Sequence, residues 1–182
     1  PETKDIYSIK LPKKIKILKS QKILCAKYRK GHYEGVLDIM DRLTNTIKPK
    51  NIFMGIKDFQ QLHLVKRFIH NNYNSKVIAC KTIRDKNKLA LSSRNFLLNK
   101  TEFKKAGNIA KTIILLKKEL NDIKNTRQFL THKKKELNKR FNINIEYLEL
   151  RKSANLKKTN KIKKARIFIA YYLGKVRLID NF

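Results

Sequence analysis

The sequence predicts an α/β fold in its first part and a small α+β domain in its second. Apolar segments at 51–55 and 77–80 flank a segment with helical periodicity, and this strand–helix–strand order is typical of a parallel sheet. Later, two helical segments precede residues with alternating hydrophobicity, which favours an antiparallel sheet beside two helices. We therefore place residues 1–83 in the α/β domain and residues 84–182 in the α+β domain.

The first domain contains four further segments. Residues 1–14 are polar and read as a connecting segment, and 15–24 as a strand followed by a helix. A break at 28–33 leads into an amphipathic helix over about 33–48, which Pro49 ends. The apolar segment 51–55 that follows is expected to be a short buried strand.

Asp58 is a candidate N-cap for the next helix, before a turn at 71–74 and the strand at 77–80. Beyond an irregular segment at 85–98, Asn99 and Glu102 have the spacing of a capping box. The helix that this box opens has one apolar face, formed by Ala106, Ile109, Ile113, Leu116 and Leu120. A second helix over about 126–140, alternating residues at 143–150, a lysine-rich loop at 152–164 and a strand pair across Gly174 complete the chain.

The composition indicates a folded protein with a strong positive charge. The chain has 182 residues, 41% of them hydrophobic, which is enough to form a core. No apolar run approaches the roughly 18 residues of a membrane span, and no signal peptide is recognisable. Cys25 and Cys80 lie far apart and outside any metal-binding spacing. We expect reduced thiols, a cytoplasmic location and no membrane partner.

A formal net charge of +31 raises the alternative of a nucleic-acid-binding protein. The lysines are spread along the whole chain beside many Ile and Asn residues, as an AT-rich coding sequence would produce. A dedicated nucleic-acid module would confine its basic residues to a stripe or add stacking aromatic pairs, and neither is clear. Nucleic-acid contact is therefore expected to be non-specific only.

Two segments carry the strongest functional signals. Gly55–Gln61 lies where a strand ends and a helix begins, a position that favours anionic ligands through the helix N-terminal amides. Leu91–Asn95 offers two hydroxyls and a guanidinium, a suitable clamp for phosphate or carboxylate. Since the second segment follows the domain boundary, we expect one ligand site where the two domains meet.

Four segments in this order resemble the pantothenate synthetase (pantoate–β-alanine ligase) family. They are Arg29-Lys30-Gly31-His32-Tyr33, Gly55-Ile56-Lys57-Asp58-Phe59-Gln60-Gln61, Leu91-Ser92-Ser93-Arg94-Asn95 and Arg177-Leu178-Ile179-Asp180-Asn181. The family pattern reads Arg-Pro-Gly-His-Phe, Gly-Glu-Lys-Asp-Phe/Tyr-Gln-Gln, Leu-Ser-Ser-Arg-Asn and Arg-Leu-Ile-Asp-Asn. The resemblance implies the latter part of a Rossmann-like nucleotidyltransferase domain followed by a C-terminal domain with an antiparallel sheet.

The resemblance implies a two-step, ATP-dependent ligation. Pantoate attacks the α-phosphate of ATP to give pantoyl adenylate and pyrophosphate, and β-alanine then displaces AMP. Mg²⁺ would accompany ATP, no protein-held metal is implied, and a usually dimeric family allows for a homodimer. The family's His-x-Gly-His signature precedes the matched region, so the 182 residues alone are expected to be a partial enzyme without turnover. A remnant of the ligase that keeps the fold but not the reaction is a further alternative.

The resemblance also assigns roles to individual residues. Lys57 and Arg94 are the candidate catalytic residues, at the phosphates and at the departing pyrophosphate. The implied ATP-binding residues are Gly55, Ile56, Lys57, Asp58, Ile83, Leu91, Ser92, Ser93 and Arg94. The implied pantoate-binding residues are Gln61, Arg29 and His32.

Three positions depart from the family pattern. Ile56 stands where the family has Glu, Lys30 where it has Pro, and Lys88 where it has Gly. The first removes a negative charge beside the expected phosphate site, and the second removes a residue that would fix the loop.

Overall fold

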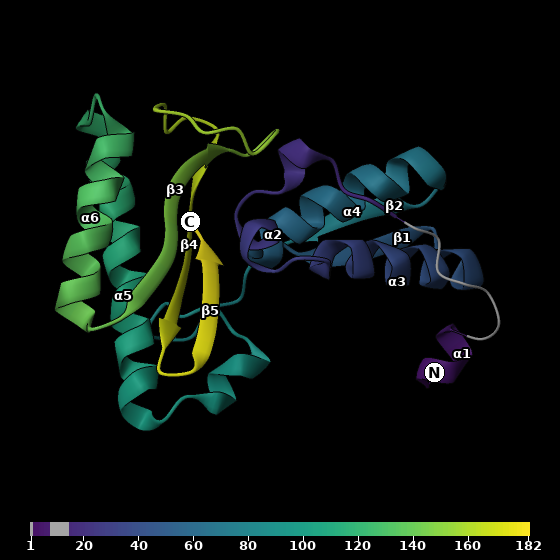
Figure 1. The fold of residues 1–182 in the computed structure, drawn as a ribbon, viewed down its shortest axis with the longest axis horizontal. Coiled ribbons are helices and arrows are strands. Elements are labelled where there is room, and N and C mark those ends of the chain that lie inside the picture. Colours follow the sequence, from purple (N-terminus) through teal and green to yellow (C-terminus); the bar gives the residue numbers. More distant parts are fainter. Residues whose placement is uncertain (1, 8–14) are drawn as a thin grey trace. The chain divides into compact units, whose positions relative to one another are not determined.

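The computed structural model describes residues 2–7 and 15–182 and divides into two compact units, which are described separately (Figure 1). The division falls after Lys81, whereas the sequence analysis places it after residue 83. The expected connecting segment 1–14 contains a short helix, α1 (Thr3–Ile6), and its residues 1 and 8–14 lie outside the described part. Among the described residues, no helix is long and apolar enough to cross a membrane.

The first unit contains a two-stranded parallel sheet, as the strand–helix–strand order predicts (Figure 1). Strand β1 (Asn51–Gly55) pairs with β2 (Lys76–Cys80), and helix α4 (Phe59–Asn72) connects them. Helix α3 (His32–Ile47) packs against α4, and Lys48 follows it as a C-cap in the left-handed conformation before Pro49. The predicted helix over 33–48 is therefore confirmed.

Two predictions for the first unit are wrong. Residues 15–24 form no strand: a 3₁₀ turn, η1 (Lys19–Gln21), precedes a four-residue helix, α2 (Cys25–Tyr28). Strand β1 is not buried on both faces, because its residues alternate between exposed and half-buried. Phe53 is 67% exposed beside its register partner Ile78, which is 37% exposed. A short apolar run does not by itself distinguish a strand buried on one face from a strand buried on both.

The second unit, Thr82–Phe182, combines two helices with a three-stranded antiparallel sheet, as expected (Figure 1). The helices are α5 (Lys100–Glu119), with the 3₁₀ turn η4 (Leu120–Asp122) at its end, and α6 (Thr126–Phe141). The strands are β3 (Asn144–Lys152), β4 (Ala165–Leu173) and β5 (Val176–Asn181), in the spatial order β3-β4-β5.

The core of the second unit lies between α5, α6 and the sheet. The apolar face predicted for α5 is confirmed, and its members are at most 3% exposed. They meet apolar residues of α6 and of the three strands: Leu130, Leu137, Ile145, Leu148, Leu150, Ile167, Ile169, Tyr171 and Leu178. Burying about ten large aliphatic side chains at roughly 1.5–3 kcal/mol each makes this cluster the main source of stability in the unit.

Local backbone chemistry fixes the ends of these elements. The capping box is present: Asn99 accepts a hydrogen bond from the Glu102 amide (2.9 Å), and the Glu102 carboxylate accepts one from the Asn99 amide (3.0 Å). The turn between β4 and β5 places Gly174 at a φ of +53°, where a Cβ atom would lie 2.8 Å from the Glu102 carboxylate. The conformation therefore favours glycine, and a larger residue would also displace the Glu102 carboxylate.

Candidate functional site

Gly55–Gln61 occupies the predicted position between a strand and a helix. β1 ends at Gly55, residues Ile56–Asp58 form a 3₁₀ turn (η2), and α4 begins at Phe59. Because β1 and β2 are parallel, their carboxyl ends share this edge of the sheet, with Gly55 paired to Cys80. Asp58 stands at the N-cap position of α4, but its carboxylate makes no capping hydrogen bond and instead lies 3.7 Å from the Lys57 ammonium.

The two glutamines after this turn have different environments. The Gln60 side chain is 5% exposed, and its amide donates to the carbonyls of Gln21 (3.1 Å) and Ile23 (2.8 Å). Gln60 thus fixes the first turn of α4 against the segment before α2. Gln61 is half-buried, and within the described residues its amide has no side-chain hydrogen bond. A primary amide in that state can both donate to and accept from a ligand.

Arg29 and His32 form a pair in the loop that enters α3. Arg29 Nη1 lies 2.7 Å from His32 Nε2, and Gly31 between them adopts a φ of +77°. Tyr33 follows as a buried residue, and burial raises the pKa of its phenol, with smaller contributions from Cys25 and Asp58. This loop and the Gly55–Gln61 segment both belong to the first unit. Their joint role at one ligand stays a prediction.

Leu91–Arg94 lies in the second unit, before and within the 3₁₀ helix η3 (Ser93–Leu97). The Leu91 amide donates to the carbonyl of Ile83 (3.0 Å), so these two expected ATP-binding residues are neighbours. Their side chains are 53% and 67% exposed. Ser92 caps η3 by accepting a hydrogen bond from the Arg94 amide (3.3 Å). A single site shared with Gly55–Gln61 stays a prediction, since the two segments belong to different units.

The Arg94 side chain is half-buried and oriented by the sheet. Its Nη1 donates to the carbonyl of Arg177 in β5 (3.3 Å). Arg177 in turn forms an ion pair with Glu146 of β3, in which their closest atoms are 2.6 Å apart. Strand β5 thus fixes the direction of the guanidinium that the sequence singles out.

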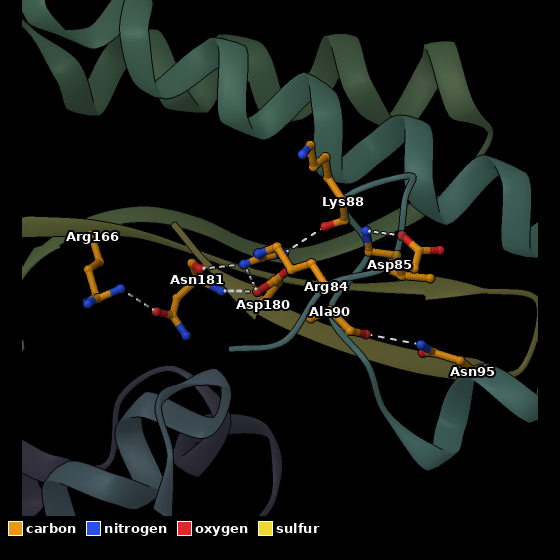
Figure 2. A network of polar contacts seen from close by, with 9 residues as sticks. Arg84, Asp85, Lys88, Ala90, Asn95, Arg166, Asp180 and Asn181 are labelled. Atoms are coloured by element: carbon orange, nitrogen blue, oxygen red, sulfur yellow. Dashed lines mark hydrogen bonds and ion pairs between the residues drawn. The ribbon is translucent and has the colours of Figure 1, made fainter. Parts of the chain in front are cut away.

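A partly buried ion pair in the second unit was not predicted. Arg84 donates to both carboxylate oxygens of Asp180, at 2.6 and 2.9 Å (Figure 2). The sequence analysis gives neither residue a site role. Arg84 and Asp180 lie 96 positions apart, so no local pattern reveals their contact. The one available signal is an aspartate within an apolar strand, since a buried carboxylate requires a partner.

The position that departs from the family glycine has the backbone conformation of a glycine. Lys88 adopts a φ of +69° in the turn that its amide closes onto the Asp85 carbonyl (2.9 Å). A left-handed conformation is unfavourable for a residue with a Cβ atom. The turn therefore has a backbone conformation that glycine would adopt more easily, and the lysine is strained in it.

Replacing Lys88 by glycine should raise the free energy of unfolding by about 0.5–1 kcal/mol, because the strain is removed. Urea denaturation of the two proteins measures the change. Lys86→Gly removes the same charge in the same turn, where φ is not positive. It should lower stability by about 0.5 kcal/mol, because glycine only loosens the unfolded chain there. Equal effects of the two substitutions would contradict this explanation.

The protein itself supplies few candidate metal ligands near these segments. In the described ranges, no group of three or more His, Cys, Asp or Glu side chains could hold a metal ion. Within Gly55–Gln61, Asp58 is the one carboxylate, and its side chain is 48% exposed. One carboxylate suits Mg²⁺ that arrives coordinated by phosphates, because such an ion keeps most of its water and phosphate ligands.

Comparison with known proteins decides the family. The profile of the family described as pantoate-beta-alanine ligase matches residues 1–182. The chain belongs to this family. The pantothenate synthetases of a Sulfurihydrogenibium species (strain YO3AOP1) and of Clostridium botulinum (strain ATCC 19397) are 32% and 35% identical to it over its whole length. The chain covers 66% of each, so it spans about two thirds of these pantoate–β-alanine ligases.

Solved structures of the pantoate–β-alanine ligase family have the same fold. Pantothenate synthetase from Thermus thermophilus superposes with a TM-score of 0.85 at 23% identity, over 100% of this chain and 67% of the other. Pantoate-beta-alanine ligase from Francisella tularensis gives a TM-score of 0.77 at 34% identity, over 98% and 61%. The latter was solved in complex with beta-gamma ATP and beta-alanine. The predicted α/β fold class is thereby confirmed.

Proposed function

We propose that this chain belongs to an enzyme that condenses pantoate with β-alanine, using ATP, to form pantothenate. The observation that carries the proposal is the family match along all 182 residues. The Francisella tularensis relative, solved in complex with beta-gamma ATP and beta-alanine, supports the same substrates here. In the proposed reaction the pantoate carboxylate attacks the α-phosphate of ATP. Pyrophosphate leaves, and the amine of β-alanine then displaces AMP from the acyl adenylate.

In the first unit, Lys57 would bind phosphate oxygens and offset the repulsion between the pantoate carboxylate and the triphosphate. Its ammonium stands at the end of β1 and before α4, where the helix amides add positive potential. Gln61 would hold pantoate through its available amide, and the Arg29–His32 pair would contact the same substrate. Gly55, Ile56 and Asp58 would line the ATP.

In the second unit, Ser92, Ser93 and Arg94 would bind the phosphates that leave as pyrophosphate. The contact from Arg94 to the β5 carbonyl supports a guanidinium held in place before the ligand binds. Ile83 and Leu91 present adjacent exposed apolar side chains that suit the flat face of an adenine. Mg²⁺ bound to ATP would supply further charge neutralisation, with Asp58 as the carboxylate available to its water shell.

We also propose a cellular location and an oligomeric state for the enzyme. Within the described residues, neither Cys25 nor Cys80 forms a disulfide. A reducing, cytoplasmic location is proposed from the sequence. A homodimer formed by the nucleotide-binding domain is proposed from the family alone. We further propose that turnover requires the part of the relatives that these 182 residues do not span, and that the isolated chain has none.

The test is the formation of pantothenate from pantoate, β-alanine and ATP by the complete gene product, followed by mass spectrometry. One AMP and one pyrophosphate should appear for each pantothenate, and pyrophosphate should exchange into ATP when β-alanine is omitted. Absence of pantothenate from a folded protein with all three substrates would contradict the proposal. Turnover by the 182 residues alone would refute the partial-enzyme part of it.

The salt dependence of nucleic-acid binding by the complete gene product distinguishes this function from the nucleic-acid-binding alternative. Binding that comes only from the +31 charge should weaken steeply between about 50 and 200 mM salt. Tight, sequence-dependent binding at the higher salt, without pantothenate formation, would favour a nucleic-acid-binding protein.

A further inference from the structure

Residues 83–91 form a closed loop that leads directly into the Ser92–Arg94 segment. Arg84 and Ala90 pair as an antiparallel bridge, and the Asp85 amide donates to the Leu89 carbonyl (2.9 Å). At the end of the loop, the Asn95 side chain donates to the Ala90 carbonyl (3.0 Å). Because the loop is closed and continuous with Ser92 and Arg94, contacts that hold the loop in place also determine the backbone path of these two residues.

Arg84 links this loop to strand β5. Besides the bidentate pair with Asp180, its guanidinium donates to the carbonyls of Lys88 (2.9 Å) and Asn181 (3.2 Å). It also lies over the Phe182 ring, 4.5 Å from its centroid. One side chain thus contacts the far side of its own loop and the last residues of the chain (Figure 2).

The exposure of this pair indicates a rigid contact. The side chains of Arg84 and Asp180 are 21% and 8% exposed, and Asp180 also accepts from the Asn181 amide (2.8 Å). Charge-assisted bidentate pairs of low exposure are stronger and more directional than surface ion pairs. Together with the contact from Arg94 to Arg177, this pair attaches the loop segment to β5 at both its ends.

We propose that Arg84 and Asp180 are positioning residues that hold the Ser92–Arg94 segment in the geometry required for polyphosphate. The inference rests on the proposed function for its ligand. Neither residue would touch the substrate. Their pair would keep the loop backbone, and through it the Ser92 hydroxyl and the Arg94 guanidinium, in place before the phosphates arrive.

The experiment compares Arg84→Gln with Arg166→Gln. Arg166 belongs to β4 and donates to the Asn181 side chain (3.1 Å), so its substitution also removes one positive charge and a contact to the end of β5 (Figure 2). Hydrogen exchange is measured at the amides of Leu91 and Asn95, which bond to Ile83 and Ser92. Asp180→Asn, which keeps the side-chain shape without the charge, serves as a second variant if Arg84→Gln fails to fold.

Exchange at these two amides should rise about tenfold in Arg84→Gln and Asp180→Asn and stay unchanged in Arg166→Gln. Pyrophosphate affinity, measured by calorimetry at about 0.2 M salt to screen the overall charge, should fall roughly tenfold to a hundredfold in the same two variants. Unchanged exchange, or an equal rise in all three variants, would overturn the proposal. The proposal would also be overturned if the loss of pyrophosphate affinity in the variants is explained entirely by a lower unfolding temperature.

Failure of the proposed function gives a different result. If the unsubstituted chain and its Arg94→Gln variant bind pyrophosphate equally well, Arg94 is not a phosphate ligand and that part of the proposed function fails. The exchange comparison needs no ligand, so it still decides whether Arg84 and Asp180 position the segment.

Discussion

Replacing Arg94 by alanine in the complete gene product is expected to lower the rate of pantothenate formation about 100- to 1,000-fold. A donor placed where charge develops in the transition state has an effect of this size when it is removed. In the structure, the carbonyl of Arg177 accepts from Arg94 Nη1 at 3.3 Å, so the guanidinium is oriented by the protein itself. Lys57→Ala should cause a similar loss, since its ammonium is the cation of the Gly55–Gln61 segment. Initial rates over a range of ATP concentrations measure both losses.

The matched control is Arg127→Ala. Arg127 is an exposed arginine of α6, so its loss also lowers the net charge by one but should leave the rate unchanged. If the two residues act on the same phosphates, the double variant should lose less than the product of the single losses. Unchanged turnover in the double variant would refute the assigned roles.

The largest stability effect is expected at the centre of the second unit. Ile113 of α5 is fully buried among the residues of the core cluster. Truncating it to alanine removes apolar contacts and leaves a cavity, so the free energy of unfolding should fall by about 2–5 kcal/mol. Because native domains are only marginally stable, a loss near the upper end would unfold this unit at moderate temperature.

Leu115, two residues further along α5, provides the control. Its side chain is 57% exposed, so Leu115→Ala should change stability by about 0.5 kcal/mol or less. Urea denaturation followed by circular dichroism measures both variants. Similar losses at the two positions would show that this face of α5 is not the buried one.

The sequence predicted those elements whose signals are local. Hydrophobic periodicity located α3, α4 and α5, and the Asn99–Glu102 spacing correctly predicted a capping box. These predictions are correct because helix periodicity and capping depend on residues three or four positions apart. The prediction for residues 15–24 is wrong because their scattered apolar residues fit no single period. Tertiary contacts, such as those from the Gln60 side chain, determine the path of this segment.

In the candidate site, too, features with local sequence signals were predicted, whereas those that depend on distant contacts were missed. Its motif residues were found because contiguous residues carry the family pattern, and the structure places Lys57 and Arg94 on ordered elements. The Arg84–Asp180 pair was missed because its contact joins residues far apart in the chain. The left-handed backbone of Lys88 was likewise not predicted, since a lysine gives no reason to expect it and the family glycine at this position was the only signal.

The exposed side chains of Phe53 and Ile78 form an apolar strip that favours association between molecules, whereas the net charge of the chain opposes it. Parallel sheets are ordinarily covered on both faces, and an uncovered apolar strip beside open strand edges is a template for association. The net charge of +31 opposes such association, because like-charged molecules repel at distances comparable to the Debye length. Added salt shortens that length while leaving the apolar strip attractive. We therefore expect the repulsion between lysine-rich surfaces to keep these molecules apart at low salt, and concentrated salt to promote their association through the exposed apolar strip.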